Sequence, residues 1–201
     1  QQVSLLTPKI CTKKRVIMGQ TSILARRRFF TPAKSKAYDQ LKWAKRDSLI
    51  VNPATKAPVF EQRDVEFPEG WSLNAINIVA QKYFRGTPGT AERETSLKQV
   101  IDRVADTIAN WGIEGGYFAD ATEADAFRDE LKYILVTQRA AFNSPVWFNI
   151  GVKGVPQQAS ACFILAVDDT MDSILNWYRE EGLIFKGGSG AGLNLSRIRS
   201  S

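Results

Sequence analysis

The spacing of apolar residues changes near residue 142, and this change constrains the fold more than any other feature of the sequence. Before it, apolar residues recur at the i, i+3, i+4 spacing of amphipathic helices. After it come short apolar runs at 146–150 and 161–167, the second long enough for a fully buried strand. A helix starting at residues 168–170 and an alternating stretch at 193–198 complete a strand–helix–strand order. That order predicts a parallel pair in an α/β sheet or barrel.

Three amphipathic helices are predicted between residues 73 and 135. Gly86 ends the first and Gly112 ends the second, while Thr122 begins the third as a capping residue with Asp125 three positions later. Their apolar faces are Leu73, Ile76, Val79, Ala80, Tyr83 and Phe84; Leu97, Val100, Ile101, Val104, Ala105 and Ile108; and Ala124, Phe127, Leu131, Ile134 and Leu135. We interpret these faces as a hydrophobic core, because none of them contains a pattern of acids or cysteines.

The net charge of +6 is distributed unevenly along the chain. Residues 1–46 contain 12 Lys and Arg and a single acid, Asp39, whereas residues 47–201 contain 15 basic and 20 acidic residues. A basic segment of this kind is typical of a solvated, partly disordered leader, of an organellar transit peptide or of a phosphate-binding arm. We therefore expect a basic arm at 1–46 and an acidic body.

The rest of the chain divides into two further parts. Residues 47–70 are rich in proline and charge and should be extended or looped, since proline disfavours helix. We expect a helical N-terminal domain at 47–140 and the start of an α/β barrel at 141–201. A strand at the very end of the chain, with no partner strand after it, indicates a portion of a larger protein.

Composition excludes several classes of protein. No apolar run approaches the ~18 residues of a membrane span. Two cysteines, Cys11 and Cys162, cannot form a disulfide framework. The sequence has no histidine, which rules out a Ser-His-Asp triad or a histidine-ligated zinc within this chain. No metal ligands are predicted.

Three features could carry chemistry. The glycine-rich turn 187–192 lacks the Lys-Ser/Thr of a P-loop and the third glycine of a dinucleotide fingerprint, so it is a close-approach turn with an unknown ligand. Cys162 is either an inert buried thiol or a redox thiol at a strand end. Asp168 and Asp169 stand where a helix cap or a ribose ligand would be.

Several segments together resemble the adenosylcobalamin-dependent (class II) ribonucleotide reductases. They are 141–151 (AFNSPVWFNIG), 158–163 (QASACF), 185–192 (FKGGSGAG) and 194–200 (NLSRIRS), with 28–31 (RFFT), 80–84 (AQKYF) and 93–96 (RETS) nearer the N-terminus. The resemblance covers about residues 27–201. It implies an α/β fold in which a helical domain precedes a ten-stranded α/β barrel, here incomplete.

The resemblance also implies a chemistry. Such enzymes reduce ribonucleotides to deoxyribonucleotides through a thiyl radical whose formation depends on adenosylcobalamin. A cysteine pair supplies two electrons and closes to a disulfide. By motif position, Cys162 matches the first cysteine of that pair. The radical cysteine, the glutamate base, the second redox cysteine and the reductant cysteines of the family lie beyond Ser201.

Binding residues are carried over by motif position as well. Substrate binding is implied for Ser144, Ser160, Ala161, Gly187 and Gly188, and binding of a regulatory dNTP for Asp169, Arg197 and Arg199. No cobalamin-binding residues are identifiable in the chain. The implied partners are a ribonucleotide substrate, a dNTP effector, a thioredoxin-type or dithiol reductant and a second copy of the chain, in the cytoplasm, without membrane or nucleic acid.

Three alternatives stay open. A class I large subunit shares the barrel and the Cys162-type strand, although the NSPVWFN stretch at 143–149 favours class II. A nucleic-acid-binding module would use the basic arm, but the acidic body and the lack of a nucleic-acid motif count against it. A non-catalytic helical adaptor is the third.

Overall fold

The described part of the protein, residues 28–200 of a computed structural model, begins with a short 3-10 helix η1 (Ala37–Gln40) and an antiparallel hairpin. The hairpin pairs β1 (Trp43–Val51) with β2 (Pro58–Pro68). Residues 47–70, predicted as extended or looped, are therefore largely a paired ribbon. Its prolines stand at the ends of β2 and in the turn, where no ladder N–H is needed. The boundary expected at residue 46 falls inside β1.

The three predicted helices are present, with two differences at their ends. They are α1 (Leu73–Lys82), α2 (Leu97–Glu114) and α3 (Ala121–Val136). Helix α2 continues past Gly112 to Glu114, and the glycine leaves room for the ring of Phe118, to which a Cβ would come within 2.4 Å. Helix α3 begins one residue before Thr122, because the Asp120 side chain rather than the threonine accepts the capping hydrogen bond from Glu123 N.

The hydrophobic core lies between the hairpin and these helices. Its fully or nearly buried members are Val65 and Phe67 of β2, Ile76 and Ala80 of α1, Phe84 just after α1, Leu97, Val100, Ile101 and Ala105 of α2, and Leu135 and Val136 of α3. Most of these positions belong to the apolar faces predicted from spacing. The two residues from β2 were not predicted, since the proline-rich segment gave no strand pattern.

The apolar run 146–150 is mostly a short helix, α4 (Ser144–Asn149). Pro145 occupies its first turn, where a missing N–H costs nothing. Val146 and Ile150 pack against Val104 of α2 in a second small cluster. This packing joins α4 to the helical part of the chain.

The predicted strand–helix–strand unit consists of β3 (Cys162–Ala166), α5 (Met171–Lys186) and β4 (Gly190–Asn194). The two strands are parallel, as predicted. Three details differ. Strand β4 begins within the glycine-rich segment, β3 exposes every second residue instead of being fully buried, and Thr170 caps α5 in place of the preceding aspartates.

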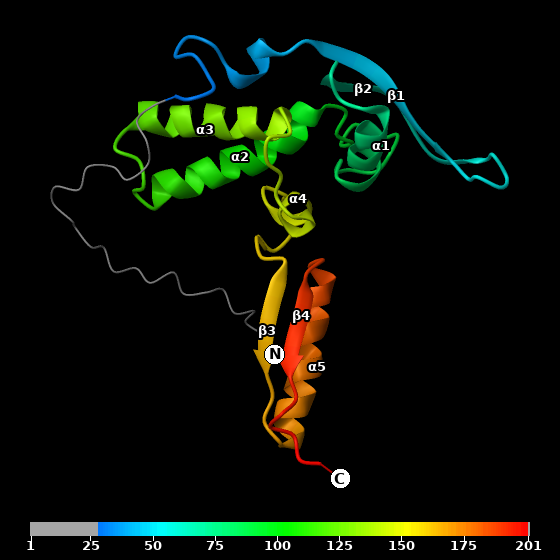
Figure 1. Cartoon of the computed structure of the whole chain (residues 1–201), viewed down its shortest axis with the longest axis vertical. Helices are drawn as coiled ribbons and strands as arrows, with labels where there is room; N and C mark the ends of the chain where they lie inside the picture. The colour runs from blue at the N-terminus through cyan, green and yellow to red at the C-terminus, as the bar shows by residue number, and fades with distance from the viewer. Residues whose placement is uncertain (1–27, 201) are drawn as a thin grey trace.

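Figure 1 shows this unit extending away from the helices and the hairpin, with α4 at the junction. Residues 28–200 thus combine helices with two separate two-stranded sheets, an α/β arrangement in which no sheet closes. None of the helices in this range has the length and apolar character required to cross a membrane.

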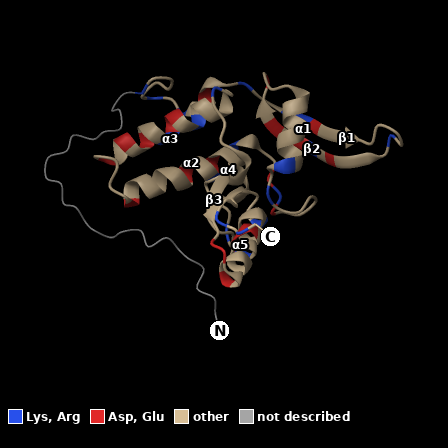
Figure 2. Ribbon diagram, turned by 60° about the horizontal axis from the view of Figure 1, so that its bottom comes forward, with Lys and Arg blue, Asp and Glu red and all other residues tan. Residues whose placement is uncertain are grey.

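Ion pairs join Arg28 to Asp129 of α3 and join Lys132 of α3 to Asp102 and Asp106 of α2. Figure 2 marks the acidic and basic positions along the ribbon. The Glu130 carboxylate accepts hydrogen bonds from the backbone N–H groups of Phe29, Phe30 and Thr31 and from the Thr31 hydroxyl. Burial opposes its ionisation, but these donors outweigh burial and hold the pKa of Glu130 below its ordinary value. Residues 28–31, part of the expected basic arm, are thus fixed on α3, while residues 1–27 and Cys11 lie outside the described residues.

Candidate functional site

Cys162 lies at the first position of β3 and is exposed. In the parallel register it faces Gly190, and Ile164 faces Gly192. Paired residues of neighbouring strands project to the same side of a sheet. A Cβ built on either glycine would have no neighbour closer than 3.8 Å. The strand face beside the thiol is therefore bare backbone, with room for a ligand to approach.

The turns that lead into the two strands are tied to each other. The Ser189 hydroxyl, which is buried, donates to Ser160 O at 2.6 Å and accepts from the Gln158 side-chain amide. The oxygen of the same amide would lie only 2.6 Å from a Cβ built on Gly187. Ser160 and Gly187, both expected near the substrate, are thus held together by Gln158 and Ser189, which the sequence analysis did not single out.

Gly188 has a positive φ of 82°, which favours glycine, and its Cβ would lie 3.3 Å from the Phe148 ring. Internal packing therefore requires glycine at 187 and 188. The sequence-based explanation, close approach of the substrate, applies better to Gly190 and Gly192.

Helix α4 connects the glycine turn to the helical part of the chain. The Asn149 side chain is buried and donates to Gly187 O at 3.0 Å and to Pro145 O at 2.7 Å. Phe148 stacks on Tyr83, whose hydroxyl lies 3.0 Å from Ser144 Oγ. Ser144 therefore lies on α4, the short helix whose Asn149 contacts Gly187 and whose Phe148 lies beside Gly188.

A buried ion pair fixes α4 from the other side. Arg103 of α2 bonds Glu94 at 2.9 Å, and both side chains are only 12% exposed. The same guanidinium donates to Trp147 O at 2.7 Å and to Tyr83 O at 2.9 Å. One side chain therefore links α2, the end of α1 and α4.

The residues expected to bind an effector meet at the opposite end of the strands. Asp169 Oδ2 lies 2.7 Å from Arg199 Nε, and Asp168 Oδ1 lies 3.0 Å from Arg197 Nη1. Both arginines are largely exposed. The structure therefore brings Asp169, Arg197 and Arg199 to one place.

Two clusters thus stand at the two ends of the β3–β4 pair. Cys162, Ser160, Ala161, Gly187 and Gly188 lie at the amino-terminal ends of the strands, and the Asp–Arg pairs lie at their carboxyl ends. Strand β3 has five residues, so its four steps alone span about 13 Å, and Asp168 and Asp169 follow two and three residues after its end. The two groups of residues are too far apart to hold one small group of a ligand together.

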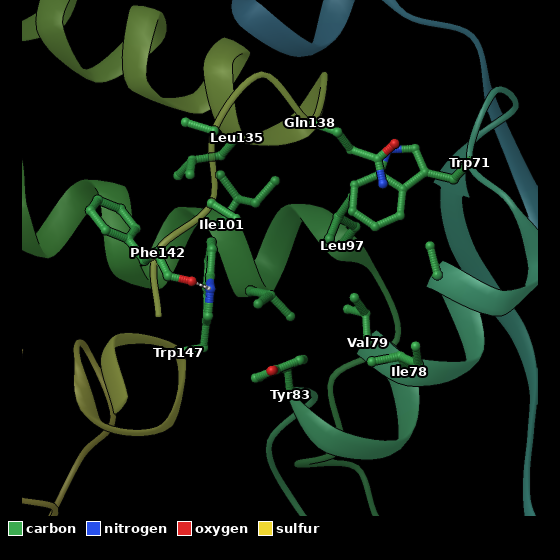
Figure 3. Close-up of a pocket in the computed structure, with 14 residues that line it drawn as sticks. Trp71, Ile78, Val79, Tyr83, Leu97, Ile101, Leu135, Gln138, Phe142 and Trp147 are labelled. Atoms are coloured by element: carbon green, nitrogen blue, oxygen red, sulfur yellow. Dashed lines mark hydrogen bonds between the residues drawn. The ribbon is translucent and has the colours of Figure 1, made fainter. Parts of the chain in front are cut away.

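A separate apolar hollow of about 400 Å³ lies among α1, α2 and the segment before α4. In Figure 3 the side chains of Trp71, Tyr83 and Trp147 surround it, and the Trp147 indole donates to Phe142 O at 2.8 Å. Its lining is predominantly apolar, so it offers hydrophobic contact rather than polar recognition.

The described residues offer no site at which side chains alone would hold a metal ion. Within residues 28–200 no three side chains of His, Cys, Asp or Glu gather where they could hold a metal ion. The whole sequence has no histidine that could donate a nitrogen to cobalt. This absence concerns a bare metal ion and not a cobalamin, because the corrin ring carries its own nitrogen ligands for cobalt.

Comparison with known families agrees with the resemblance described above. Residues 44–138 match the model described as "Class II vitamin B12-dependent ribonucleotide reductase", and residues 160–201 match "Ribonucleotide reductase, barrel domain". The second match covers β3, α5 and β4. The class that the fold and the site define is thus a chain containing part of a ribonucleotide reductase barrel domain.

Individual relatives make the class more specific. Vitamin B12-dependent ribonucleotide reductases of Streptomyces avermitilis and Rhodopirellula baltica are 60% identical over 164 residues and 39% identical over 186 residues. These alignments cover 82% and 79% of this chain but 17% and 18% of the relatives. A vitamin B12-dependent ribonucleoside-diphosphate reductase of Thermoplasma acidophilum is 42% identical over 127 residues, covering 63% of this chain and 15% of the relative.

The chain belongs to the class II, vitamin B12-dependent ribonucleotide reductases, and it spans less than a fifth of the length of these relatives. The recognition made from sequence motifs is confirmed. The match of residues 44–138 to a class II model favours this family over the class I, nucleic-acid-binding and adaptor alternatives.

Proposed function

We propose that this chain is the N-terminal part of an enzyme that reduces ribonucleotides to deoxyribonucleotides, with Cys162 as one of two redox thiols. Family membership supports the reaction class. The observation that carries the role of Cys162 is its place on β3: the thiol is exposed beside Gly190 and Gly192, where no side chain would obstruct a ribose ring.

The chemistry requires two thiols. The ribose 2′-hydroxyl leaves as water and a C–H bond replaces the C–O bond, so two electrons and two protons must be supplied. Two thiols supply both when they close to a disulfide. Cys162 gives its proton to the departing hydroxyl and then forms the S–S bond with a second cysteine, which the resemblance places after residue 201. Bound cobalamin, in its adenosyl form, supplies the radical that starts the reaction.

The residues around Cys162 then hold the substrate. Ser144 and Ser160 provide hydroxyl groups for the phosphates and the ribose, and Ala161, Gly187 and Gly188 provide backbone at the same place. The Asn149 and Gln158 hydrogen bonds keep these segments in register with the strand. Their contribution is positioning, since a misplacement of about 1 Å lowers a rate strongly.

Asp169, Arg197 and Arg199 form an effector site in this proposal. The two arginines bind the phosphates of a regulatory dNTP, and Asp169 accepts a hydrogen bond from its deoxyribose hydroxyl. The site lies beyond the far end of β3, whose length is about 13 Å, so an effector bound here does not compete with the substrate. The Asp169–Arg199 pair is exposed enough to rearrange around the ligand.

The remaining features of the proposal follow from the family. The β3–α5–β4 unit is the start of a ten-stranded α/β barrel, which covers the exposed side of these strands. A thioredoxin-type or dithiol reductant restores the cysteine pair after each turnover. The enzyme works as a homodimer in the cytoplasm and has no nucleic-acid or membrane partner.

The test is Cys162→Ser in the full-length reductase. We expect multiple turnover with cobalamin and a dithiol to stop, while binding of the ribonucleotide persists, because the hydroxyl cannot form a disulfide. Cys11→Ser is the control and should retain turnover. Unchanged turnover of the Cys162→Ser enzyme would remove Cys162 from this role. The 201-residue chain alone should produce no deoxynucleotide.

A further inference from the structure

Three arginines meet where α1 ends, and their side chains are used very differently. They are Arg85, Arg93 and Arg103. A guanidinium has five N–H donors and no acceptor, so a part-buried arginine needs several oxygen partners. An arginine whose donors all have partners within the chain is structural. An arginine whose donors lack such partners is available to a ligand.

Arg93 is fully engaged within the chain. Its guanidinium donates to the carbonyls of Ala80 at 2.6 Å, Phe84 at 2.7 Å and Gly86 at 3.1 Å, and to the Gln62 side chain at 2.9 Å. These bonds close the carboxyl-terminal end of α1. Arg93 is therefore structural.

Arg103 is engaged as well. It bonds Glu94 and the carbonyls of Tyr83 and Trp147, as described above. Glu94 has its other carboxylate oxygen occupied by the backbone N–H of Arg85 at 2.8 Å. The single carboxylate of this region is thus fully used, and it neutralises Arg103.

Arg85 has a fixed backbone and an unpartnered side chain. Its N–H donates to the Glu94 carboxylate, and its carbonyl accepts from Glu94 N at 2.8 Å. Its Nε is buried without a hydrogen-bond partner, and among residues 28–200 the guanidinium forms no ion pair. Burial lowers the pKa of Arg85, and the like charge of Arg103 lowers it further. Glu94 offsets one of the three arginine charges, and the Arg85 guanidinium has no carboxylate of its own among residues 28–200.

The position of this charge relates it to the substrate cluster. The Arg85 guanidinium carbon lies 6.0 Å from the centre of the Phe148 ring. The same ring stacks on Tyr83, which reaches Ser144, and it is the group nearest to the Cβ position of Gly188. Arg85 is therefore one aromatic ring away from the residues expected to hold the substrate.

We propose that Arg85 binds a phosphate group of the ribonucleotide substrate, next to Ser144 and the Gly187–Gly188 turn. The proposal rests on the proposed function and adds to it the residue that neutralises the phosphate charge. A guanidinium suits this task because its paired N–H groups match two phosphate oxygens. Arg103 and Arg93 cannot take part, since their donors are already used.

Binding measurements on the full-length reductase test this proposal, because they do not require turnover. We expect Arg85→Gln to weaken ribonucleotide binding about 10- to 100-fold, the loss of one charge-assisted contact. Arg85→Lys should recover part of the affinity, because it keeps the charge but not the paired donors. Arg63→Gln, on an exposed arginine of the hairpin, is the matched control and should bind as the wild type does.

Two comparisons identify the ligand group. Inhibition by the corresponding ribonucleoside, which has no phosphate, should be equal in the wild type and the Arg85→Gln variant. Binding of a dNTP effector should also be equal, because the Asp169 cluster lies at the other end of the strands. An equal loss for nucleoside and nucleotide, or unchanged nucleotide binding, would overturn the proposal. If Arg85→Gln does not fold, the binding of nucleoside and nucleotide is compared in Arg85→Lys, which should lose affinity for the nucleotide alone.

The outcomes separate this proposal from the proposed function. Turnover that survives Cys162→Ser contradicts the redox role but leaves phosphate binding by Arg85 standing. If Arg85→Gln weakens binding of the nucleoside and the nucleotide equally while Cys162→Ser stops turnover, only the proposed role of Arg85 is overturned.

Discussion

The helical part of the chain and the β3–α5–β4 unit bury their apolar residues to very different degrees. In the first, Phe67, Ile76 and Ile101 are fully buried between the hairpin and three helices. In the second, Ile164 is 91% exposed, and α5 has no buried residue within the described chain. One helix on two strands cannot cover both faces of a parallel pair. The exposed face is the one that holds Cys162, so the unit leaves open the surface on which we place the chemistry.

The largest expected effect tests this contrast directly. Phe67→Ala should lower the free energy of unfolding of the 201-residue chain by about 3–5 kcal/mol, because it creates a cavity in the closed core. Ile164→Ala should change it by less than about 0.5 kcal/mol, since the side chain is already in solvent. Urea unfolding of both variants measures the difference. Equal losses would contradict the contrast.

The junction between the two parts should be nearly as sensitive. Arg103→Met leaves the buried Glu94 carboxylate and the carbonyls of α4 without a donor, and should cost about 3 kcal/mol of unfolding free energy. Arg63→Met, whose arginine is 74% exposed, is the control and should cost less than about 1 kcal/mol. If the two variants unfold at the same urea concentration, the ion pair does not stabilise the junction.

A pair of glycines separates backbone strain from steric conflict in the loop after α1. Gly86 and Gly89 both have a positive φ, but only at Gly86 would a Cβ collide with the backbone, 2.3 Å from Glu92 O. Gly89→Ala should cost about 1 kcal/mol and Gly86→Ala about 2 kcal/mol or more. Thermal unfolding of the two variants gives the comparison, and an equal cost would mean that the loop adapts to the extra carbon.

The smallest effect concerns the attachment of residues 28–31 to α3. Because the folded-state pKa of Glu130 lies below its ordinary value of about 4.3, ionised Glu130 stabilises the fold above that pH, and the stabilisation is lost as the pH falls through the lowered value. Glu130→Gln should cost about 1 kcal/mol at neutral pH, a modest value because the carboxylate is part-exposed, and nothing well below pH 4. Urea unfolding as a function of pH measures this.

Glu180→Gln, on the exposed α5, is the matched control for this effect. Its carboxylate accepts one side-chain hydrogen bond, from Asn176, and its replacement should change the free energy of unfolding by less than about 0.5 kcal/mol. A Glu130→Gln variant with the same loss of stability at pH 3 and pH 7 would show that charge is not what fastens residues 28–31.

Prediction from the sequence succeeded where the signal was local. The three helices, the parallel order of β3 and β4 and the family motifs all follow from spacing over a few residues. It was less accurate where two local signals competed. Gly112 suggested a helix end, but its reason is the Phe118 ring, and Thr122 suggested a cap, but Asp120 makes the capping bond. The hairpin was not predicted as a pair of strands, because its prolines and charges obscured the alternation.

The candidate site shows the same division. Cys162, Ser144, Ser160 and the Gly187–Gly188 turn were named from motifs, and the structure gathers most of them at one end of the strands. Gln158, Ser189 and Asn149, which connect these segments, were not found. Their partners are 29 to 38 residues away in sequence, and an amide or hydroxyl side chain carries no spacing signal of its own. The glycine-rich turn before the last strand was the sequence feature that indicated backbone contacts at this end of the strands.

The sequence by itself determined the helices, the parallel strand–helix–strand unit and the family, because hydrophobic period and short motifs are local properties of a chain. The tertiary structure decided which side chains meet. It paired Arg103 with Glu94, joined α4 to Gly187 through Asn149, and, within residues 28–200, left the Arg85 Nε without a hydrogen-bond partner. These contacts depend on the path of the whole chain, because the groups that meet come from different segments of the sequence. Once such polar groups are buried, water is no longer available to them, so each must find a partner within the protein.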